Sequence, residues 1–280
     1  MKFSHRVYYR KLYFSFPMKQ EPALREVYCA LLKGEKNILV DCGVSYNHPD
    51  IVALAAEAGL GLCDIHAIII THCHADHTGG LFQLKQEYPH IQVWTHPLGK
   101  EMVEDIDRQY KKRPVPAYYT LMGGSVPVDR VLQDGETLDL GYPVQIFHTP
   151  GHSVDSLSVY LPDDALLLSG DLIPYIHDLP IYESLDDLRS SLLKIESIPT
   201  NYYISGFGGL WDNNADGNLL KITNQRLEDV QTAVESFLSS NPDGTLEEMG
   251  KYVITQIGLK GIPIPIFLTS LSEHIKLSRV

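Results

Sequence analysis

Three histidines and an aspartate lie within six consecutive positions of the chain, a density that packing alone does not explain. They form the run His72-x-His74-x-Asp76-His77. This run follows the apolar segment 67–70, and unpartnered imidazoles and carboxylates are costly to bury, so a positive charge is expected among them. Zinc, iron and manganese all take such ligands. The pattern predicts a metal site, and we expect Gly79 and Gly80 to supply a tight turn through backbone angles closed to other residues.

Three other segments place polar or glycine residues directly after an apolar strand pattern. They are Asn37–Gly43, His148–Ser153 and Leu166–Asp171. Together with the histidine run, and in this order, they resemble the motifs of the metallo-β-lactamase superfamily over roughly residues 26 to 210. The resemblance implies a fold of mixed helices and strands, classed as α/β (α+β). Its architecture would be a four-layer αββα sandwich, in which two sheets pack face to face with helices outside.

The resemblance also implies which residues bind metal. His72, His74 and His152 would form a first site, and Asp76, His77 and Asp171 would contribute to a second, with Asp171 bridging. We expect one or two zinc ions, with iron or manganese as alternatives. Three neutral imidazoles leave a fourth position open for water, as in catalytic zinc sites.

Two residues are candidates for catalysis beyond metal binding. Asp76 is expected to accept or orient a proton, with or without a second ion. Tyr175 resembles tyrosines of the family's lactonases, which donate a hydroxyl to the developing oxyanion. Because the chain has 16 tyrosines, the favoured alternative is that Tyr175 is a packed or rim residue. Asp41 and Thr71 are expected to accept the remaining imidazole N–H groups, although Asp41 could equally be a turn residue.

The chain departs from the family pattern at one expected ligand. Where many members carry a last histidine, the sequence reads Ser205-Gly206-Phe207-Gly208. The second site is then short of a nitrogen ligand. Water or another residue fills the position, or the ion binds weakly, or one ion suffices. The substitutes we consider are His177, His48 and His148.

Composition limits the partners and the compartment. The 280 residues carry a formal net charge of -12, which repels polyanions and predicts that nucleic acid is not a partner. Residues 111–113 form a short basic run, which we interpret as a solvated helix end. The four cysteines lack the spacing of a disulfide framework, and neither a leader nor a membrane span is evident. We therefore expect a cytoplasmic protein without membrane contact.

Periodicity divides the chain into two parts. Residues 1–217 hold the strands and helices of the sandwich, and residues 218–280 are expected to form a helical extension that packs on it. A helix is predicted over 99–110, and the irregular segment 111–127 is our candidate for a substrate-facing loop. The extension could cap the site or form a homodimer contact, and the sequence leaves both open.

Three functions are consistent with these motifs. The first is a metal-dependent hydrolase in which a metal-bound hydroxide attacks a small ester, lactone or thioester. The second, which the Phe207 position favours, resembles the mono-iron persulfide dioxygenases of the same superfamily. The third is a non-catalytic binding protein with a degenerate second site. The first is our leading hypothesis, because the six matched ligand positions are otherwise intact.

Overall fold

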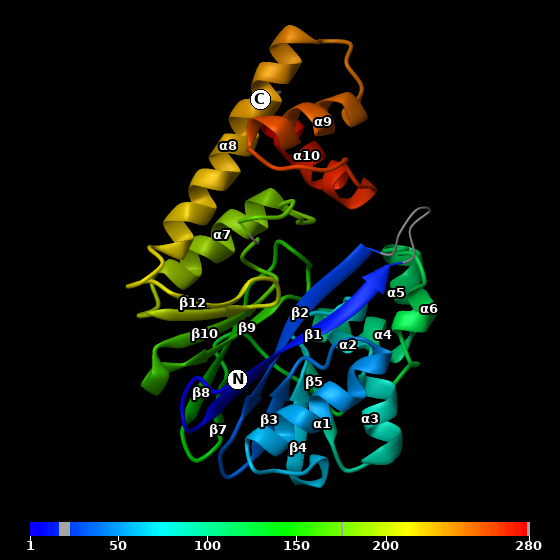
Figure 1. Ribbon diagram of the computed structural model, residues 1–280, viewed down its shortest axis with the longest axis vertical. Coiled ribbons are helices and arrows are strands. Elements are labelled where there is room, and N and C mark those ends of the chain that lie inside the picture. The colour runs from blue at the N-terminus through cyan, green and yellow to red at the C-terminus, as the bar shows by residue number, and fades with distance from the viewer. Residues whose placement is uncertain (17–22, 175, 279–280) are drawn as a thin grey trace.

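Two six-stranded sheets lie face to face in the computed structural model, which describes residues 1–16, 23–174 and 176–278 (Figure 1). The first sheet has the order β1-β2-β3-β4-β5-β6, formed by Val7–Phe16, Ala23–Leu32, Asn37–Val40, Ile65–Ile69, Gln92–Thr95 and Arg130–Val131. The second has the order β12-β11-β10-β9-β8-β7, formed by Gly209–Asp212, Tyr202–Ser205, Leu166–Gly170, Leu157–Leu161, Pro143–His148 and Thr137–Asp139.

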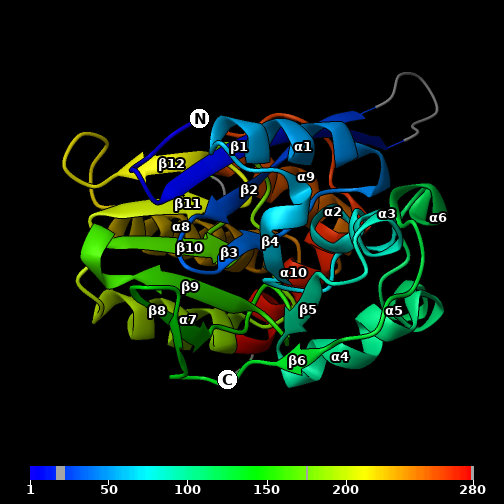
Figure 2. The same ribbon diagram turned by 90° about the horizontal axis from the view of Figure 1, so that it is seen from below.

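Helices cover the outer face of each sheet (Figure 2). Those over the first sheet are α1 (His48–Glu57), α2 (Ala75–Thr78), α3 (Leu81–Glu87), α4 (Pro97–Glu104), α5 (Ile106–Lys112) and α6 (Tyr118–Leu121). Those over the second are α7 (Leu185–Glu196) and the start of α8 (Leu219–Ser240). Short 3-10 turns occupy Ser45–Asn47, Leu62–Asp64 and Pro162–Asp164. The predicted αββα sandwich is confirmed.

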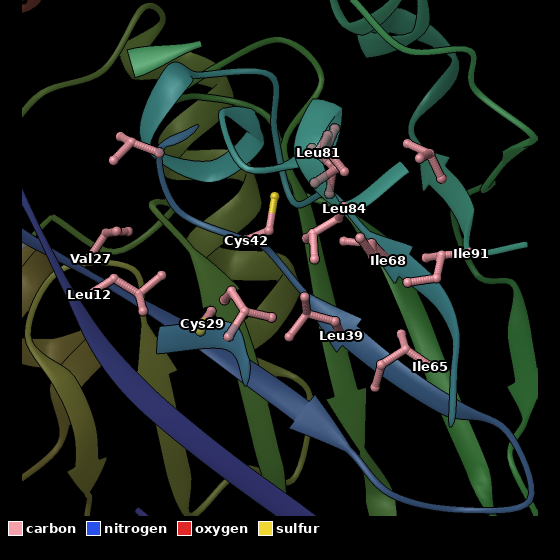
Figure 3. Packing of buried hydrophobic residues seen from close by; sticks show 14 of the residues in the cluster. Leu12, Val27, Cys29, Leu39, Cys42, Ile65, Ile68, Leu81, Leu84 and Ile91 are labelled. Carbon is pink, nitrogen blue, oxygen red and sulfur yellow. The ribbon is translucent and has the colours of Figure 1, made fainter. Parts of the chain in front are cut away.

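Alternation along each strand explains why the sheets have two buried faces. In and after β4, Ile68 and Ile70 face the helices of the first sheet, whereas Ala67 and Ile69 face the second sheet. In β10, Leu167 faces α7, and its neighbours face the first sheet. Figure 3 shows Ile68 beside Leu84 of α3 in the outer layer. A slip of one residue would exchange these faces, so the strand register is fixed and the residues after each strand have defined positions.

The last helices form a cluster of their own at one end of the molecule (Figure 1). They are α8, α9 (Leu246–Gln256) and α10 (Pro265–Ser278). The predicted C-terminal helical extension is therefore present, whereas a division at residue 217 stays a prediction. Within the described ranges, no helix is both long and apolar enough to span a bilayer.

A buried polar network joins this extension to the loop before α7. Ser270 Oγ accepts from the Tyr182 backbone N–H and donates to the Tyr182 carbonyl oxygen, both at 2.9 Å. The Tyr182 hydroxyl donates to His274 Nε2, and His274 Nδ1 donates to Gln231 Oε1 at 2.6 Å. Burial lowers the pKa of His274 to about 4, which keeps its ring neutral for this arrangement. We call Tyr182, Gln231, Ser270 and His274 the C-terminal clasp.

One predicted helix is divided in the structure. The segment 99–110 belongs to two helices, α4 and α5, which meet at Asp105. The Asp105 carboxylate accepts from the backbone N–H groups of Asp107 and Arg108, both at 3.1 Å, and so caps α5. The sequence periodicity continues through this cap, which is why it suggests a single helix.

Candidate metal centre

Five strand ends converge on one edge of the sandwich and carry the predicted polar residues. The residues that follow β3, β4, β8, β10 and β11 are, respectively, Asp41, the 72–77 run, His152, Asp171 and Phe207. The sheets thus bring together side chains that lie up to 166 positions apart, from Asp41 to Phe207. This edge is where loops on a rigid scaffold can hold a functional site.

Three imidazoles surround one carboxylate oxygen, and a fourth lies beside one of them. Asp171 Oδ2 lies 3.3 Å from His77 Nε2, 3.4 Å from His152 Nε2 and 3.7 Å from His72 Nε2. His152 Nε2 is also 3.0 Å from His74 Nδ1. Two groups of mutually close donor atoms result, namely His72, His74 and His152, and His72, His77 and Asp171. His72 belongs to both groups.

These donor atoms fit a metal ion. Zinc–nitrogen bonds of about 2.0–2.1 Å place the ligand atoms of a tetrahedron roughly 3.4 Å apart, close to the separations observed here. His72 Nε2, His77 Nε2 and Asp171 Oδ1 are buried and have no hydrogen-bond partner among the described residues. Buried polar atoms are rarely left unpaired. A divalent cation would satisfy all three.

Neighbouring groups orient three of the rings toward the centre. His77 Nδ1 donates to Asp41 Oδ2, and His152 Nδ1 donates to the Ile181 carbonyl oxygen, each at 2.8 Å. His72 Nδ1 faces Thr71 Oγ1 at 3.2 Å, and that hydroxyl itself donates to Asp41. In the neutral form of each ring, this contact leaves the Nε2 lone pair toward the donor group, which is how outer carboxylates and carbonyls prepare metal ligands.

The charges of the metal-free centre follow from burial. Burial, reinforced by neighbouring positive groups, lowers the pKa values of His72 and His74 well below the ordinary range. Burial also lowers the pKa of His152. For His77 burial acts in the same direction, but three aspartates, Asp171 first, raise its pKa well above the ordinary value. Most of the rings are therefore neutral, as metal ligation requires.

A pocket of about 410 Å³ opens at the centre. His74, Asp76, His152 and Asp171 lie at its base. Its walls are mainly apolar and come from the loop after α5, from the segment after β10 and from residues 264–266 at the start of α10. An ion pair between Arg25 and Asp178 also lines it. The size suits a small organic ligand.

Comparison with known families identifies the fold and its motifs. The family model described as the metallo-beta-lactamase superfamily matches residues 23–206. The chain belongs to this superfamily. The matched range contains the whole candidate metal centre except Phe207.

Curated superfamily relatives match part of the chain. A beta-lactamase-like protein 2 homolog from Caenorhabditis elegans is 28% identical over 180 residues, covering 64% of this chain and 54% of the relative. An atrochrysone carboxyl ACP thioesterase from Aspergillus fumigatus is 27% identical, covering 64% and 50%. A hydroxyacylglutathione hydrolase from Rhodopseudomonas palustris is 31% identical, covering 54% and 49%. The match therefore spans about half the length of these relatives.

Solved superfamily structures share the fold over more of the chain. A metallo-beta-lactamase family protein from Thermus thermophilus superposes with a TM-score of 0.70, covering 96% of this chain and 93% of that one, at 20% identity. At this identity the likeness concerns the fold, including the C-terminal helices, and not the substrate.

Phe207 is the residue that the sequence resemblance aligns with the superfamily's last histidine. Phe207 lines the pocket together with Asp171. The proposed substitutes do not join the donor groups in the described ranges. His48 pairs with Glu87 at 3.1 Å, His148 stacks on His96 with ring centroids 3.9 Å apart, and His177 is exposed. The second group thus consists of His72, His77 and Asp171.

The remaining predicted residues fall in different places. Asp76 lines the pocket but stays outside both donor groups, with Oδ2 at 3.9 Å from His77 Nε2. Tyr175 lies outside the described residues, so its proposed role rests on the sequence alone. The Cys73 sulfur faces Asp155 Oδ1 at 3.7 Å instead of the donor groups. Asp41 fits both interpretations, since it has φ 60° in a turn and also binds His77 and Thr71.

Two sequence interpretations are wrong. Gly79 and Gly80 have ordinary helical φ values of -60° and -73°; glycine is required because a Cβ at Gly80 would lie 2.6 Å from the Cys42 carbonyl oxygen. Lys111 and Lys112 are exposed as expected, but Arg113 turns inward, lines the pocket and donates to His74 Nε2 at 2.6 Å. Sequence reasoning misses Arg113 because its neighbours dominate the pattern.

The substitution Asp41→Asn is expected to weaken zinc binding about 10- to 100-fold. Asp41 accepts three hydrogen bonds, from the Thr71 N–H and hydroxyl and from His77 Nδ1. In the variant, an amide NH2 group replaces Oδ2. This group donates and cannot accept the hydrogen bond from His77 Nδ1, so His77 would lose its orientation. Competition with a chromophoric chelator measures the change. Asp243→Asn, at an exposed position, is the control, and equal zinc affinity in both variants would contradict the role of Asp41.

Proposed function

We propose that this chain is a zinc-dependent hydrolase of small esters, thioesters or lactones. The observation that carries the proposal is the pair of donor groups sharing His72, with unpartnered buried atoms, at the base of an apolar pocket. The proposal includes zinc itself, the ligand roles of the grouped residues and a small-molecule substrate. Relatives named as a thioesterase and as a hydroxyacylglutathione hydrolase support it.

Different residues of the chain would have different roles in hydrolysis. A zinc ion bound here would lower the pKa of a coordinated water and polarise the substrate carbonyl. His72, His74 and His152 hold the first position, and Asp171 faces both donor groups. Asp76 lines the same pocket and is placed to accept a proton from the attacking water. The walls exclude bulk water from the reacting carbonyl.

A mono-iron oxygenase is the second candidate, and Phe207 favours it. The aromatic ring at this position leaves the second group with three donors, His72, His77 and Asp171, of which His72 also belongs to the first. A site that holds one ion well and a second ion weakly suits a mono-iron enzyme. Iron and imidazole–carboxylate ligands are compatible.

One experiment tests both candidates. The full chain is loaded separately with zinc and, without oxygen, with iron(II); metal content, thioester and lactone hydrolysis, and oxygen uptake with a persulfide are then measured. Hydrolysis by the zinc form is the expected result. Oxygen uptake by the iron form, with no hydrolysis by either, would replace the proposal with the oxygenase. Tight metal binding without turnover of any substrate would instead support the third function, a non-catalytic binding protein.

The free cysteines support our further proposal of a cytoplasmic location. All four are unpaired, three of them buried and Cys63 exposed. Such thiols persist in reducing compartments. Contact between two copies through the C-terminal helices stays a prediction, which sedimentation of the purified chain would test.

A further inference from the structure

Arg113 is the pocket residue that a metal site alone does not explain. Its guanidinium is partly buried and lines the pocket wall next to Pro114 and Val115. In the described part of the chain it makes one side-chain hydrogen bond, from Nη1 to His74 Nε2 at 2.6 Å, and forms no ion pair. A guanidinium has five N–H donors. Most of them are therefore available to a ligand in the pocket.

The direction of this hydrogen bond conflicts with metal ligation by His74. Arginine can only donate, so Nε2 of the neutral ring accepts, and the ring hydrogen sits on Nδ1, 3.0 Å from His152 Nε2. To bind an ion, His74 Nδ1 would have to lose its hydrogen and offer a lone pair. The ring hydrogen would then sit on Nε2, where it would face an N–H donor of Arg113. Holding an ion and holding Arg113 are thus alternatives for His74.

Metal binding would also change the charges around Arg113 so that they favour its release from His74. In the metal-free protein, burial lowers the pKa of Arg113, and the nearby carboxylates of Asp76, Glu183 and Asp171 oppose this by favouring its charged form. A divalent ion would neutralise the negative charge of the centre and repel the guanidinium. Released from His74, Arg113 would lie in a pocket whose base no longer carries a net negative charge and whose walls, such as Leu121 and Ile173, are apolar. A carboxylate is the natural partner there, because it matches the guanidinium fork.

We propose that Arg113 binds a carboxylate of the substrate, and that the preferred substrates are short acyl thioesters or esters carrying a second, free carboxylate. This inference rests on the proposed hydrolase function. Because Arg113 touches the ring of a proposed metal ligand, the free carboxylate lies only a few bonds from the carbonyl that reacts. The apolar walls then receive the leaving group.

Matched substrates test the proposal on the zinc-loaded full chain. The N-acetylcysteamine monothioesters of malonic, succinic and glutaric acids are compared with the propanoyl, butanoyl and pentanoyl thioesters. The native chain is expected to prefer the carboxylated member by kcat/KM. Arg113→Met, which keeps an apolar stem but removes the guanidinium, is expected to lower kcat/KM for the preferred carboxylated substrate about 10- to 100-fold more than for its neutral match. Lys112→Met, at the exposed neighbouring position, is expected to keep the native preference.

A binding measurement separates this inference from the hydrolase proposal. Calorimetric titration of the zinc-loaded chain with glutarate and with pentanoate is expected to show tighter glutarate binding, lost in Arg113→Met. Chelator competition is expected to show zinc bound at least as tightly by that variant, since His74 is freed. An unchanged glutarate preference in Arg113→Met overturns the role of Arg113. Absence of thioester turnover in the native chain overturns the hydrolase proposal, while the glutarate titration still decides the question of Arg113.

Discussion

Replacing His72 by alanine is expected to reduce hydrolysis about a thousand-fold, because a bound metal supplies several kcal/mol of stabilisation to such a transition state. His72 is the residue shared by both donor groups, so its loss reduces each to two ligands. Its ring is fully buried, and Nε2 has no other partner among the described residues. Both metal content and turnover should therefore fall together.

Elemental analysis and steady-state kinetics on the same samples measure the effect. His90→Ala is the matched control, because His90 is exposed, lies outside both donor groups and places Nε2 3.1 Å from the Cys63 carbonyl oxygen. Circular dichroism checks that both variants stay folded. Retention of native zinc content and rate in His72→Ala would contradict the assignment of the centre.

The metal-free protein is expected to lose stability steeply in mild acid. The folded pKa values of His72, His74 and His152 are lowered by burial, whereas the unfolded chain titrates near the ordinary value of about 6.5. As pH falls below this value, the unfolded chain binds protons that the folded chain does not, so the free energy of unfolding decreases. Each ring contributes up to about 1.4 kcal/mol per pH unit, so three rings give at most roughly 4 kcal/mol per pH unit.

His77 gives the opposite dependence on the alkaline side. Its folded pKa is raised, so its contribution is complete below about pH 6.5 and is lost as pH rises through the folded value. The four rings together predict a stability maximum near neutral pH. The pKa of Asp76 is raised and that of Asp171 is lowered, so their contributions to the pH dependence of stability oppose each other at lower pH.

Urea unfolding of the chelator-treated chain between pH 5 and pH 8 measures this profile. A fall in the unfolding free energy from pH 6.5 to pH 5.5 is expected, and His90→Ala, whose ring is exposed, should show the same slope. Zinc should raise stability most at the higher pH values, since protons compete for its ligands. A flat profile across the acid range would show that the three rings are not buried in their neutral form.

Much of the fold and centre was predictable because the relevant signals are local. The apolar run before His72 marks β4, and the segment before Asp171 marks β10, so both residues were expected at strand ends. Once the strand order is known, ends from both sheets meet at one edge. The resemblance to a known superfamily supplied that order, which periodicity alone does not give.

What the sequence did not predict depends on contacts between distant segments. Arg113 follows two exposed lysines, and nothing local indicates that it reaches His74 across 39 positions. The contacts between Tyr182 and Ser270 span 88 positions and involve ordinary polar residues without motif spacing. The glycines near residue 80 were identified correctly as constrained, but the constraint is the approach of a neighbouring backbone and not a special dihedral angle.

The C-terminal clasp connects the last helix to His152, a proposed metal ligand. The Ile181 carbonyl oxygen fixes His152, and the next residue, Tyr182, is held on both sides of its peptide backbone by Ser270 of α10. Equilibrium linkage is symmetrical. If the docking of α10 helps to align His152 for metal binding, then metal binding stabilises the docked position of α10 by the same free energy. The last helix and the candidate metal centre are therefore expected to be coupled through residues 181–182, although no sequence motif joins them.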